Sequence, residues 1–434
     1  MDGLTVAGLA IAAAMGLLVL RVPIAIALGL VSFVGIAVLR GPTVALNAFG
    51  TLPFDFTASW SLSAVPMFLL MGAVAFHAGI TTRLYASARV WLYWVPGGLA
   101  VASNLAAAGF AAASGSSLAT AAAMSRVAVP EMLRAGYDKG LATATVAAAG
   151  TLGALIPPSI IFVIYGWYTE QPVAKLLIAG ILPGILTGVV YCVMIVLRCW
   201  LKPSLAPRTD YRPTAADRWG SFGAVWPIAL LIGCLIGGIY GGVATPTEAG
   251  AFGALSAFLI AALQGKLSWK VAWDSVAEAA ATTASILFIA IGAIMLTRFL
   301  AMAGVPGFMA GLVSQLNADP FTIILAMSII YLILGMFLDP LGLMLITLPI
   351  FLPTFKALDI DLIWMGVIIV KYIEIGLLTP PVGLNAYIVK GVVGDAVALG
   401  TIFKGLGWFL VCEALIMALL LGFPEISLYL PSKM

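Results

Sequence analysis

The stretch TLGALIPPSI, residues 151–160, places two adjacent prolines inside a long apolar run. A proline in a helix interior removes a backbone hydrogen bond and clashes with the preceding turn, at a cost of roughly 3 kcal/mol. Pro157 and Pro158 therefore predict a break in an otherwise apolar helix. The backbone groups that such a break frees must find other partners.

The composition indicates a membrane protein with many helical spans. Of the 434 residues, 63% are hydrophobic and 9% are charged, and the mean hydropathy is +1.14. A helix crosses the hydrocarbon core with about 20 apolar residues, and the sequence contains about a dozen such stretches. A membrane β-barrel would need segments of about 10 residues with alternating polarity, whereas these runs are continuous. We predict an all-α polytopic membrane protein.

The distribution of Lys and Arg predicts the sidedness of the loops, because basic residues favour cytoplasmic loops. The polar, proline-rich segment at 198–218 contains five basic residues, and we expect a cytoplasmic linker between two halves over 201–218. The loops at 50–60, 168–172 and 314–320 contain no Lys or Arg. We expect these three loops on the external side.

The double proline recurs in IEIGLLTPPVG, residues 373–383. The two motifs indicate an internal repeat, and the alternative is a coincidence of Ala-, Leu- and Gly-rich composition. Under one constant offset, Gly153, Leu155, Pro157 and Pro158 correspond to Gly376, Leu378, Pro380 and Pro381, and Leu118, Pro130 and Asp138 to Leu341, Pro353 and Asp361.

The flanks of the repeat predict opposite orientations of its two copies. The segment 101–130 is bounded at both ends by basic sequence, and its counterpart beginning at 320 is bounded by neutral to acidic sequence. Each segment is broken near its centre, the first by SGSS (114–117) and the second by LDPLG (338–342). We therefore expect two re-entrant hairpins that enter from opposite faces, as in inverted-repeat transporters.

The predicted organisation follows from these segments. We expect scaffold helices at 1–100, a first transport repeat at 101–200 (hairpin 101–130, broken helix 140–166), the linker at 201–218, second-half scaffold helices at 219–316, a second transport repeat at 317–395 (hairpin 320–357, broken helix 362–391) and a C-terminal helix at 396–434.

Each hairpin tip is expected to face a broken helix and to form a cation site from carbonyl and hydroxyl oxygens. The alternatives are a tip that only packs through small residues, and an Asp339 that only caps the following helix. The expected cation-site residues are Ser114, Gly115, Ser116, Gly153 and Pro157 at the first break, and Leu338, Asp339, Gly376 and Thr379 at the second, partly through backbone carbonyls.

Several motifs together resemble the large membrane subunit of the TRAP (tripartite ATP-independent periplasmic) transporters. They are GTLGALIPPSIIFVIYG, AKLLIAGILPGIL, GGVATPTEAGAFGAL, GMFLDPLGLMLITLPIFLP and GLLTPPVGLNAYIVKG. They occur in the family's order, and the resemblance extends from about residue 60 to the end of the chain.

The resemblance implies a Na⁺-coupled secondary transporter in a bacterial or archaeal inner membrane, and no enzymatic activity. It implies an elevator-type movement and import of organic anions, such as C4-dicarboxylates or sialic-acid-like acids. It also implies two partners, a soluble periplasmic binding protein and a separate small membrane subunit of four helices. Two or more Na⁺ sites are expected, and no organic cofactor.

Substrate contacts are expected from residues at the tips and breaks and from one amide in the first hairpin. For Asn104, bridging of helices is an equal alternative, because a buried amide needs partners. The expected substrate-binding residues are Asn104, Ser116, Ser117, Pro158, Ser159, Pro381 and Asn385.

Three further polar groups have structural interpretations. Lys371 and Glu374 are spaced to pair on one helix face, for neutralisation inside the bundle or for gating. Thr245 and Glu248 are typical of a helix N-cap, and His77 of a packing residue. Tryptophans near segment ends, among them Trp91, are typical of an interfacial belt.

Three other functions are weighed against the transporter subunit. A stand-alone carrier or antiporter of the same superfamily would operate without a binding protein. An intramembrane enzyme would need a nucleophile with a base, an HExxH motif or paired aspartates, and a channel a repeated filter. The sequence has no HExxH motif and one histidine.

The sidedness prediction can be tested by labelling single cysteines in a variant in which the four native cysteines are replaced by serine. We expect Thr209→Cys to react with a membrane-impermeant maleimide only from the cytoplasm, and Ala318→Cys only from outside. The reverse pattern would show that the predicted orientation is wrong.

Overall fold

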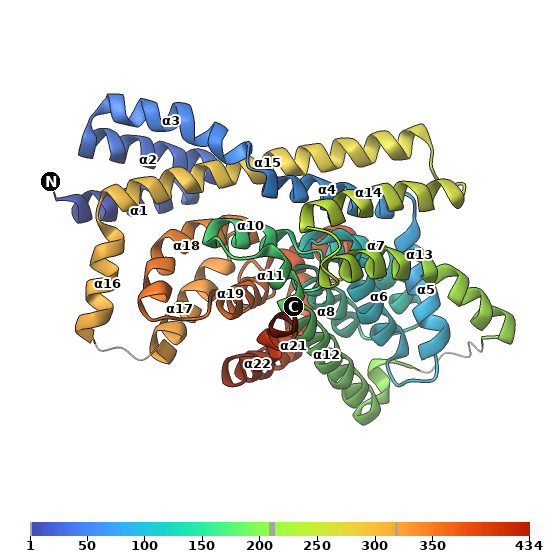
Figure 1. Ribbon diagram of the computed structural model, residues 1–434. Coiled ribbons are helices and arrows are strands. Elements are labelled where there is room, and N and C mark those ends of the chain that lie inside the picture. The colour runs from blue at the N-terminus through green and yellow to red at the C-terminus, as the bar shows by residue number, and fades with distance from the viewer. Residues whose placement is uncertain (1, 208–212, 317–319) are drawn as a thin grey trace.

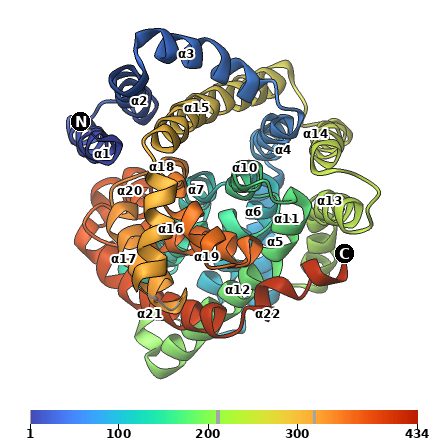
Figure 2. The same cartoon turned by 60° about the vertical axis from the view of Figure 1, so that its left-hand side comes forward.

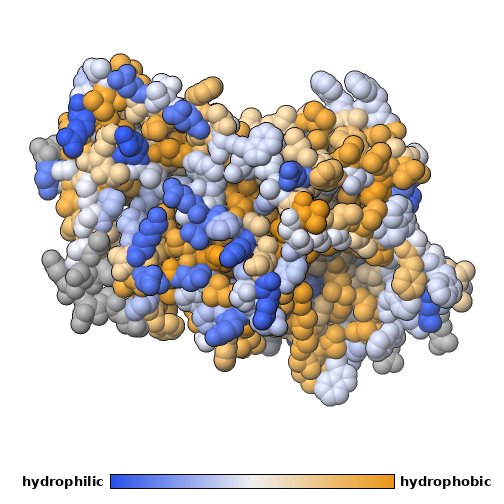
Figure 3. Space-filling view, in the orientation of Figure 1, coloured by the Kyte–Doolittle hydropathy of each residue, from blue (hydrophilic) through white to orange (hydrophobic). Residues whose placement is uncertain are grey.

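The computed structural model describes residues 2–207, 213–316 and 320–434. Within these ranges the chain forms helices and turns and no strand, which confirms the all-helical prediction. Eight helical segments in the same ranges are long and apolar enough to cross a membrane. Hydrophobic residues cover large parts of the face shown in Figure 3, as expected for a surface that contacts lipid.

One group of helices forms an outer layer. Figure 2 shows α1, α2, α3 and α15 as an arc beside the remaining bundle, and α15 packs along α2 and α4 while α14 packs on α4. The bounds in this group are α1 (Gly3–Val19), α2 (Ile24–Arg40), α3 (Pro42–Thr57), η1 (Trp60–Ser63), α4 (Ala64–His77), α5 (Ile80–Leu92), α13 (Ala215–Tyr240), α14 (Pro246–Leu263), α15 (Trp269–Met302) and α16 (Val305–Leu316).

The remaining helices form a bundle that lies below α1–α4, α14 and α15 in Figure 1, with α16 at its left and α5 and α13 at its right. The first half contributes α6 (Gly98–Ser114), α7 (Ser117–Arg134), α8 (Lys139–Gly150), α9 (Leu152–Leu155), α10 (Ile160–Thr169), α11 (Val173–Ala179), α12 (Ile181–Leu201) and η2 (Pro203–Leu205). The second half contributes α17 (Pro320–Gly335), α18 (Pro340–Ala357), α19 (Leu362–Gly376), α20 (Leu384–Val393), η3 (Gly394–Ala396), α21 (Leu399–Gly422), α22 (Glu425–Leu428) and η4 (Pro431–Lys433).

Each half contains a helical hairpin followed by an interrupted helix. The hairpins are α6–α7 and α17–α18, and the interruptions lie at residues 156–159 and 377–383. The peptide bonds Pro157–Pro158 and Pro380–Pro381 are both cis. The repeat that the double prolines predict is thus a repeat of structure.

The connection between the halves is shorter than its polar sequence suggests. Helix α13 begins at Ala215, and Thr214 and Asp217 form a reciprocal capping box at its start, an arrangement that satisfies two N-terminal donors. The last residues of the predicted linker therefore belong to a helix. Residues 208–212 of this linker and 317–319 of the predicted external loop lie outside the described residues.

Candidate functional site

The tip of the first hairpin is a two-residue connection at Gly115 and Ser116. Gly115 has a φ of +63° and ends α6, and the Ser116 hydroxyl caps α7 by accepting a hydrogen bond from the Ala119 amide at 3.4 Å. Glycine suits the left-handed C-terminal position, and serine suits the N-cap. The sequence SGSS therefore encodes the turn itself.

This tip contacts the first interrupted helix directly. A Cβ atom on Gly115 would lie 2.2 Å from the Pro158 carbonyl oxygen, and one on Gly153 would lie 2.7 Å from the Ser116 carbonyl oxygen. The Ile160 amide donates to the Gly115 carbonyl at 3.4 Å. The structure thus brings Gly115, Ser116, Gly153 and Pro158 together, with backbone oxygens from both sides of the contact.

Hydroxyl groups add oxygen atoms at the same place. The Ser114 and Thr120 hydroxyls lie 3.1 Å apart, and the Thr120 hydroxyl also donates to the Ser116 carbonyl at 2.8 Å. The Ser159 hydroxyl caps α10 by accepting from the Phe162 amide at 3.4 Å. The sequence pattern does not identify Thr120 as a site residue, because Thr120 lies one helical turn beyond the SGSS motif.

The second hairpin meets its interrupted helix through two glycines. A Cβ atom on Gly376 would lie 2.7 Å from the Cα of Gly335. Asp339 caps α18 by accepting from the Gly342 amide at 3.0 Å, and the Thr379 hydroxyl donates to the Ile375 carbonyl at 2.7 Å. The capping role of Asp339 is therefore present, and its cation role and that of Leu338 remain predictions.

The prediction that Lys371 pairs with Glu374 is wrong, because each side chain has a different partner. The Lys371 ammonium lies 2.5 Å from the Glu413 carboxylate of α21, and it donates to the Thr187 hydroxyl of α12 at 3.2 Å. The Tyr191 hydroxyl donates to the same carboxylate of Glu413. Helix spacing alone cannot reveal Glu413, which is 42 residues away in sequence.

Glu374 of α19 instead contacts the first hairpin at its tip. Its carboxylate accepts a hydrogen bond from the Ser117 hydroxyl at 2.6 Å, and Glu374, Lys371 and Glu413 are each fully buried. The buried ionic cluster, meaning these three residues, thus contains two carboxylates and one ammonium. It joins the tip of the first hairpin to the second half.

The two asparagines both bridge helices. The Asn104 amide donates to the Gly188 carbonyl of α12 at 2.9 Å, and the Asn385 amide donates to the Ala147 carbonyl of α8 at 3.0 Å. Asn104 lies ten residues before Ser114 along α6, about 15 Å from the tip. The contacts of Asn104 are those of the bridging alternative, and substrate roles for Asn104, Asn385 and Pro381 remain predictions.

The remaining polar groups act at the surface. Thr245 and Glu248 form the predicted cap as a reciprocal capping box. The His77 ring lies 2.7 Å from the Glu278 carboxylate, which ties α4 to α15.

Comparison with known proteins gives the class of this fold first. The solved structure of the Alcanivorax borkumensis YdaH transporter matches with a TM-score of 0.64 at 14% identity, over 89% of this chain and 90% of that one. Neisseria gonorrhoeae MtrF, described as one of a class of antimetabolite efflux pumps, matches with a TM-score of 0.58 at 13% identity, over 88% and 85%. The architecture is that of multi-pass membrane transporters.

The family follows from sequence. The model of the tripartite ATP-independent periplasmic transporter DctM component matches residues 11–426. The C4-dicarboxylate TRAP transporter large permease protein DctM of Pseudomonas aeruginosa is 37% identical over 87% of this chain and 88% of its own length. The isethionate TRAP transporter permease protein DctMQ of Oleidesulfovibrio alaskensis is 33% identical over 86% of this chain and 59% of its own. The chain belongs to the DctM family of large TRAP transporter permeases, so it is a membrane transport protein and not an enzyme.

The first hairpin tip leaves no room for a side chain at Gly115. We expect Gly115→Ala to lower the free energy of unfolding by roughly 1–3 kcal/mol, because alanine would be strained at positive φ and would meet the Pro158 carbonyl. Denaturant unfolding in detergent measures the effect. Gly237→Ala is the control, since its Cβ would have no neighbour within 4 Å, and equal effects of the two changes would contradict the tight contact.

The buried ionic cluster gives a second stability prediction. We expect Glu413→Gln to lower the free energy of unfolding by about 3–5 kcal/mol, because it leaves the Lys371 charge buried without its partner. The double variant Lys371→Met/Glu413→Gln should recover most of this loss, and Glu425→Gln, at an exposed site, should change little. A single variant as stable as the wild type would show that the pair does not neutralise Lys371.

Proposed function

We propose that this chain is the large membrane subunit of a Na⁺-coupled secondary transporter that imports small organic anions bearing a carboxylate. The observation that carries the proposal is the contact between the first hairpin tip and the interrupted helix. There, the Pro158 carbonyl oxygen lies close to Gly115 and the Ser116 carbonyl oxygen lies close to Gly153. Carbonyl and hydroxyl oxygens are the ligands that interrupted helices offer to Na⁺.

Two cation sites follow from the repeat. At the first, the hydroxyls of Ser114 and Ser116 and carbonyls near Gly153 and Pro157 would hold Na⁺. At the second, carbonyls near Leu338 and Gly376, the Thr379 hydroxyl and the Asp339 carboxylate would do so. The Gly376–Gly335 contact supports this correspondence, since it joins the second break to its hairpin as Gly153 and Ser116 join the first.

The substrate class rests on charge. The names of relatives specify C4-dicarboxylates, isethionate, 2,3-diketo-L-gulonate and sialic acid, all of which are small organic anions. Helix N-termini favour anions, and α7 and α10 both begin beside the first tip, at Ser117 and Ile160. Ser117, Pro158 and Ser159 are therefore proposed as substrate contacts, with Pro381 and Asn385 from the second half.

Two partners complete the proposed transporter. A soluble periplasmic binding protein would deliver the anion, and a small membrane subunit would extend the scaffold. The Oleidesulfovibrio relative carries the combined name DctMQ, and this chain aligns with 59% of it. We therefore propose that the small membrane subunit is a separate polypeptide. Elevator movement of the hairpins and interrupted helices against the outer layer would carry the substrate across the membrane.

The cation sites can be tested in proteoliposomes that contain the chain with its small subunit and binding protein. We expect Ser116→Ala and Asp339→Ala each to raise the Na⁺ concentration for half-maximal uptake roughly tenfold. Loss of one coordinating oxygen that contributes about 1.4 kcal/mol of binding free energy weakens the affinity by that factor. Ser285→Ala and Asp395→Ala, at exposed positions, are the matched controls. Unchanged Na⁺ activation in both site variants would remove the assignment.

The same proteoliposomes test the function as a whole. Radiolabelled succinate, isethionate and sialic acid are supplied with and without an inward Na⁺ gradient, and with and without the binding protein. We expect accumulation of at least one of them only when both the gradient and the binding protein are present. Uptake without the binding protein would favour the stand-alone carrier, and uptake without the gradient would contradict Na⁺ coupling.

A further inference from the structure

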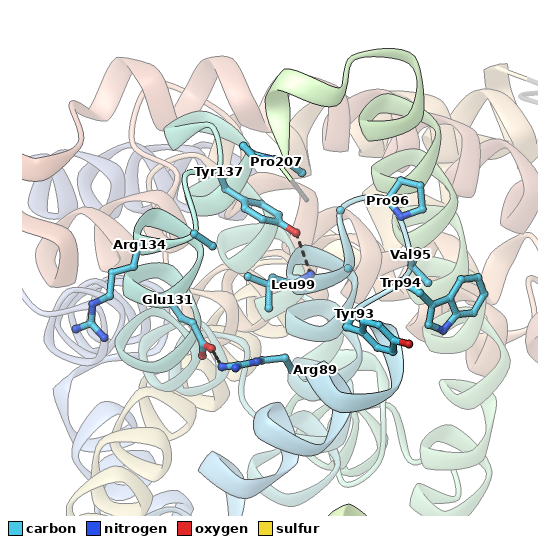
Figure 4. A pocket seen from close by; sticks show the side chains of 14 residues that line it. Arg89, Tyr93, Trp94, Val95, Pro96, Leu99, Glu131, Arg134, Tyr137 and Pro207 are labelled. Atoms are coloured by element: carbon cyan, nitrogen blue, oxygen red, sulfur yellow. Dashed lines mark hydrogen bonds and ion pairs between the residues drawn. The ribbon is translucent and has the colours of Figure 1, made fainter. Parts of the chain in front are cut away.

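A cavity lies away from the hairpin tips, beside the start of α6. Its volume is about 520 Å³, and Figure 4 shows it between the end of α5, the end of α7 and the segment that leads into α6. This side of the molecule contains the basic flanks that predict the cytoplasmic face. The lining residues that carry the argument are Arg89, Trp94, Leu99, Glu131, Arg134 and Tyr137.

The charged side chains among the described residues that line this pocket, two arginines and one glutamate, carry a net positive charge. Arg89 of α5 forms an ion pair with Glu131 of α7, and the two residues meet at the lower edge of the pocket in Figure 4. Arg134 adds a second guanidinium at the side opposite Trp94, where its side chain is exposed and points away from Tyr137. Two cations against one carboxylate favour an anionic ligand.

Tyr137 places a buried hydroxyl in the same pocket. Its oxygen accepts a hydrogen bond from the Leu99 amide at 3.2 Å, and among the described residues no acceptor is recorded for its own hydrogen. Burial raises the pKa of the Tyr137 phenol, so the hydroxyl keeps this hydrogen at physiological pH. It is available to an acceptor oxygen in the pocket.

The start of α6 does not itself supply the missing donors. The amides of Gly98 and Ala100 already donate to the carbonyls of Val95 and Gly97, each at 2.9 Å, and the Leu99 amide is bonded to Tyr137. Side chains must therefore recognise the ligand. Arginine suits a phosphate group, because its planar guanidinium donates two parallel hydrogen bonds.

Two exposed tryptophans, one of them at the end of a candidate membrane span, favour a position of this pocket near the lipid head groups. Trp94 is 73% exposed, and Trp200, near the end of α12, is 67% exposed. Exposed tryptophans at the ends of spanning helices gather at the membrane–water boundary. A ligand held beside Trp94 would therefore reach the pocket from the membrane as readily as from the cytoplasm.

We propose that this pocket binds the phosphate head group of an anionic phospholipid. The exposed Arg134 side chain would turn toward the pocket, and its guanidinium and the Tyr137 hydroxyl would donate to the phosphate oxygens, with Arg89 beside them and Trp94 at the lipid boundary. Basic pockets between spanning helices are suited to such head groups. A bound lipid would lie between α5 of the outer layer and the hairpin α6–α7, which Arg89 and Glu131 already join.

Native mass spectrometry and thermal unfolding of the full-length chain in nanodiscs test this proposal. We expect phosphatidylglycerol to remain bound when the protein is released from the nanodisc in the mass spectrometer. Nanodiscs that contain phosphatidylglycerol should also raise the melting temperature of the protein relative to nanodiscs of phosphatidylcholine alone. Arg134→Gln and Trp94→Ala should each weaken retention at least fivefold, and both residues are exposed, so the variants should fold. Arg83→Gln, an exposed arginine on the same helix as Arg89, is the matched control and should retain the lipid.

Three results would overturn the proposal. Equal loss of lipid in Arg83→Gln would show general attraction to a basic surface and no pocket. Stabilisation by 10 mM inorganic phosphate in phosphatidylcholine nanodiscs, abolished by Arg134→Gln, would identify a soluble phosphate as the ligand. Retention of phosphatidylglycerol unchanged in both Arg134→Gln and Trp94→Ala would place the lipid elsewhere.

Discussion

Backbone polar groups have no water to bind inside a bilayer, and this constraint governs the arrangement of the bundle. Irregular backbone is tolerated at that depth only inside protein or beside a watery cavity. The span 139–169, which contains the first double proline, is accordingly almost entirely buried inside the protein. The hairpins, the second half of the chain and α12 together enclose it, and Pro157 and Pro158 are buried, whereas Pro380 and Pro381 of the second interruption are exposed.

The buried ionic cluster imposes a second constraint, since removing charges from water is costly unless they are paired and hydrogen-bonded. Lys371 meets this condition through Glu413 and Thr187, which come from α21 and α12. The ammonium therefore fixes three helices from both halves in one arrangement. Hydrophobic packing alone tolerates sliding of helices, whereas a pair of this kind favours a single register.

Local sequence signals predict the parts of the fold that depend on local chemistry. The positions of both interruptions, the break at SGSS and the cap at Thr245 follow from proline, glycine and hydroxyl residues at characteristic places. The cap at Ser116, the partner of Lys371, the approach of Gly335 to Gly376 and the neighbour that Asn104 bridges to do not. The last three depend on how distant helices pack, and a glycine or an amide in an apolar run does not specify which neighbour it meets.

The hydrogen bond from Ser117 to Glu374 crosses from the first repeat to the second. A displacement of the first hairpin tip relative to α19 would break this 2.6 Å contact and leave a buried carboxylate without its donor, at a cost of a few kcal/mol. The first hairpin and the last turn of α19 are thereby coupled, although they come from different repeats. Any movement that separates the two repeats must first replace the donor of a buried carboxylate, so the cost of that movement is set by one serine.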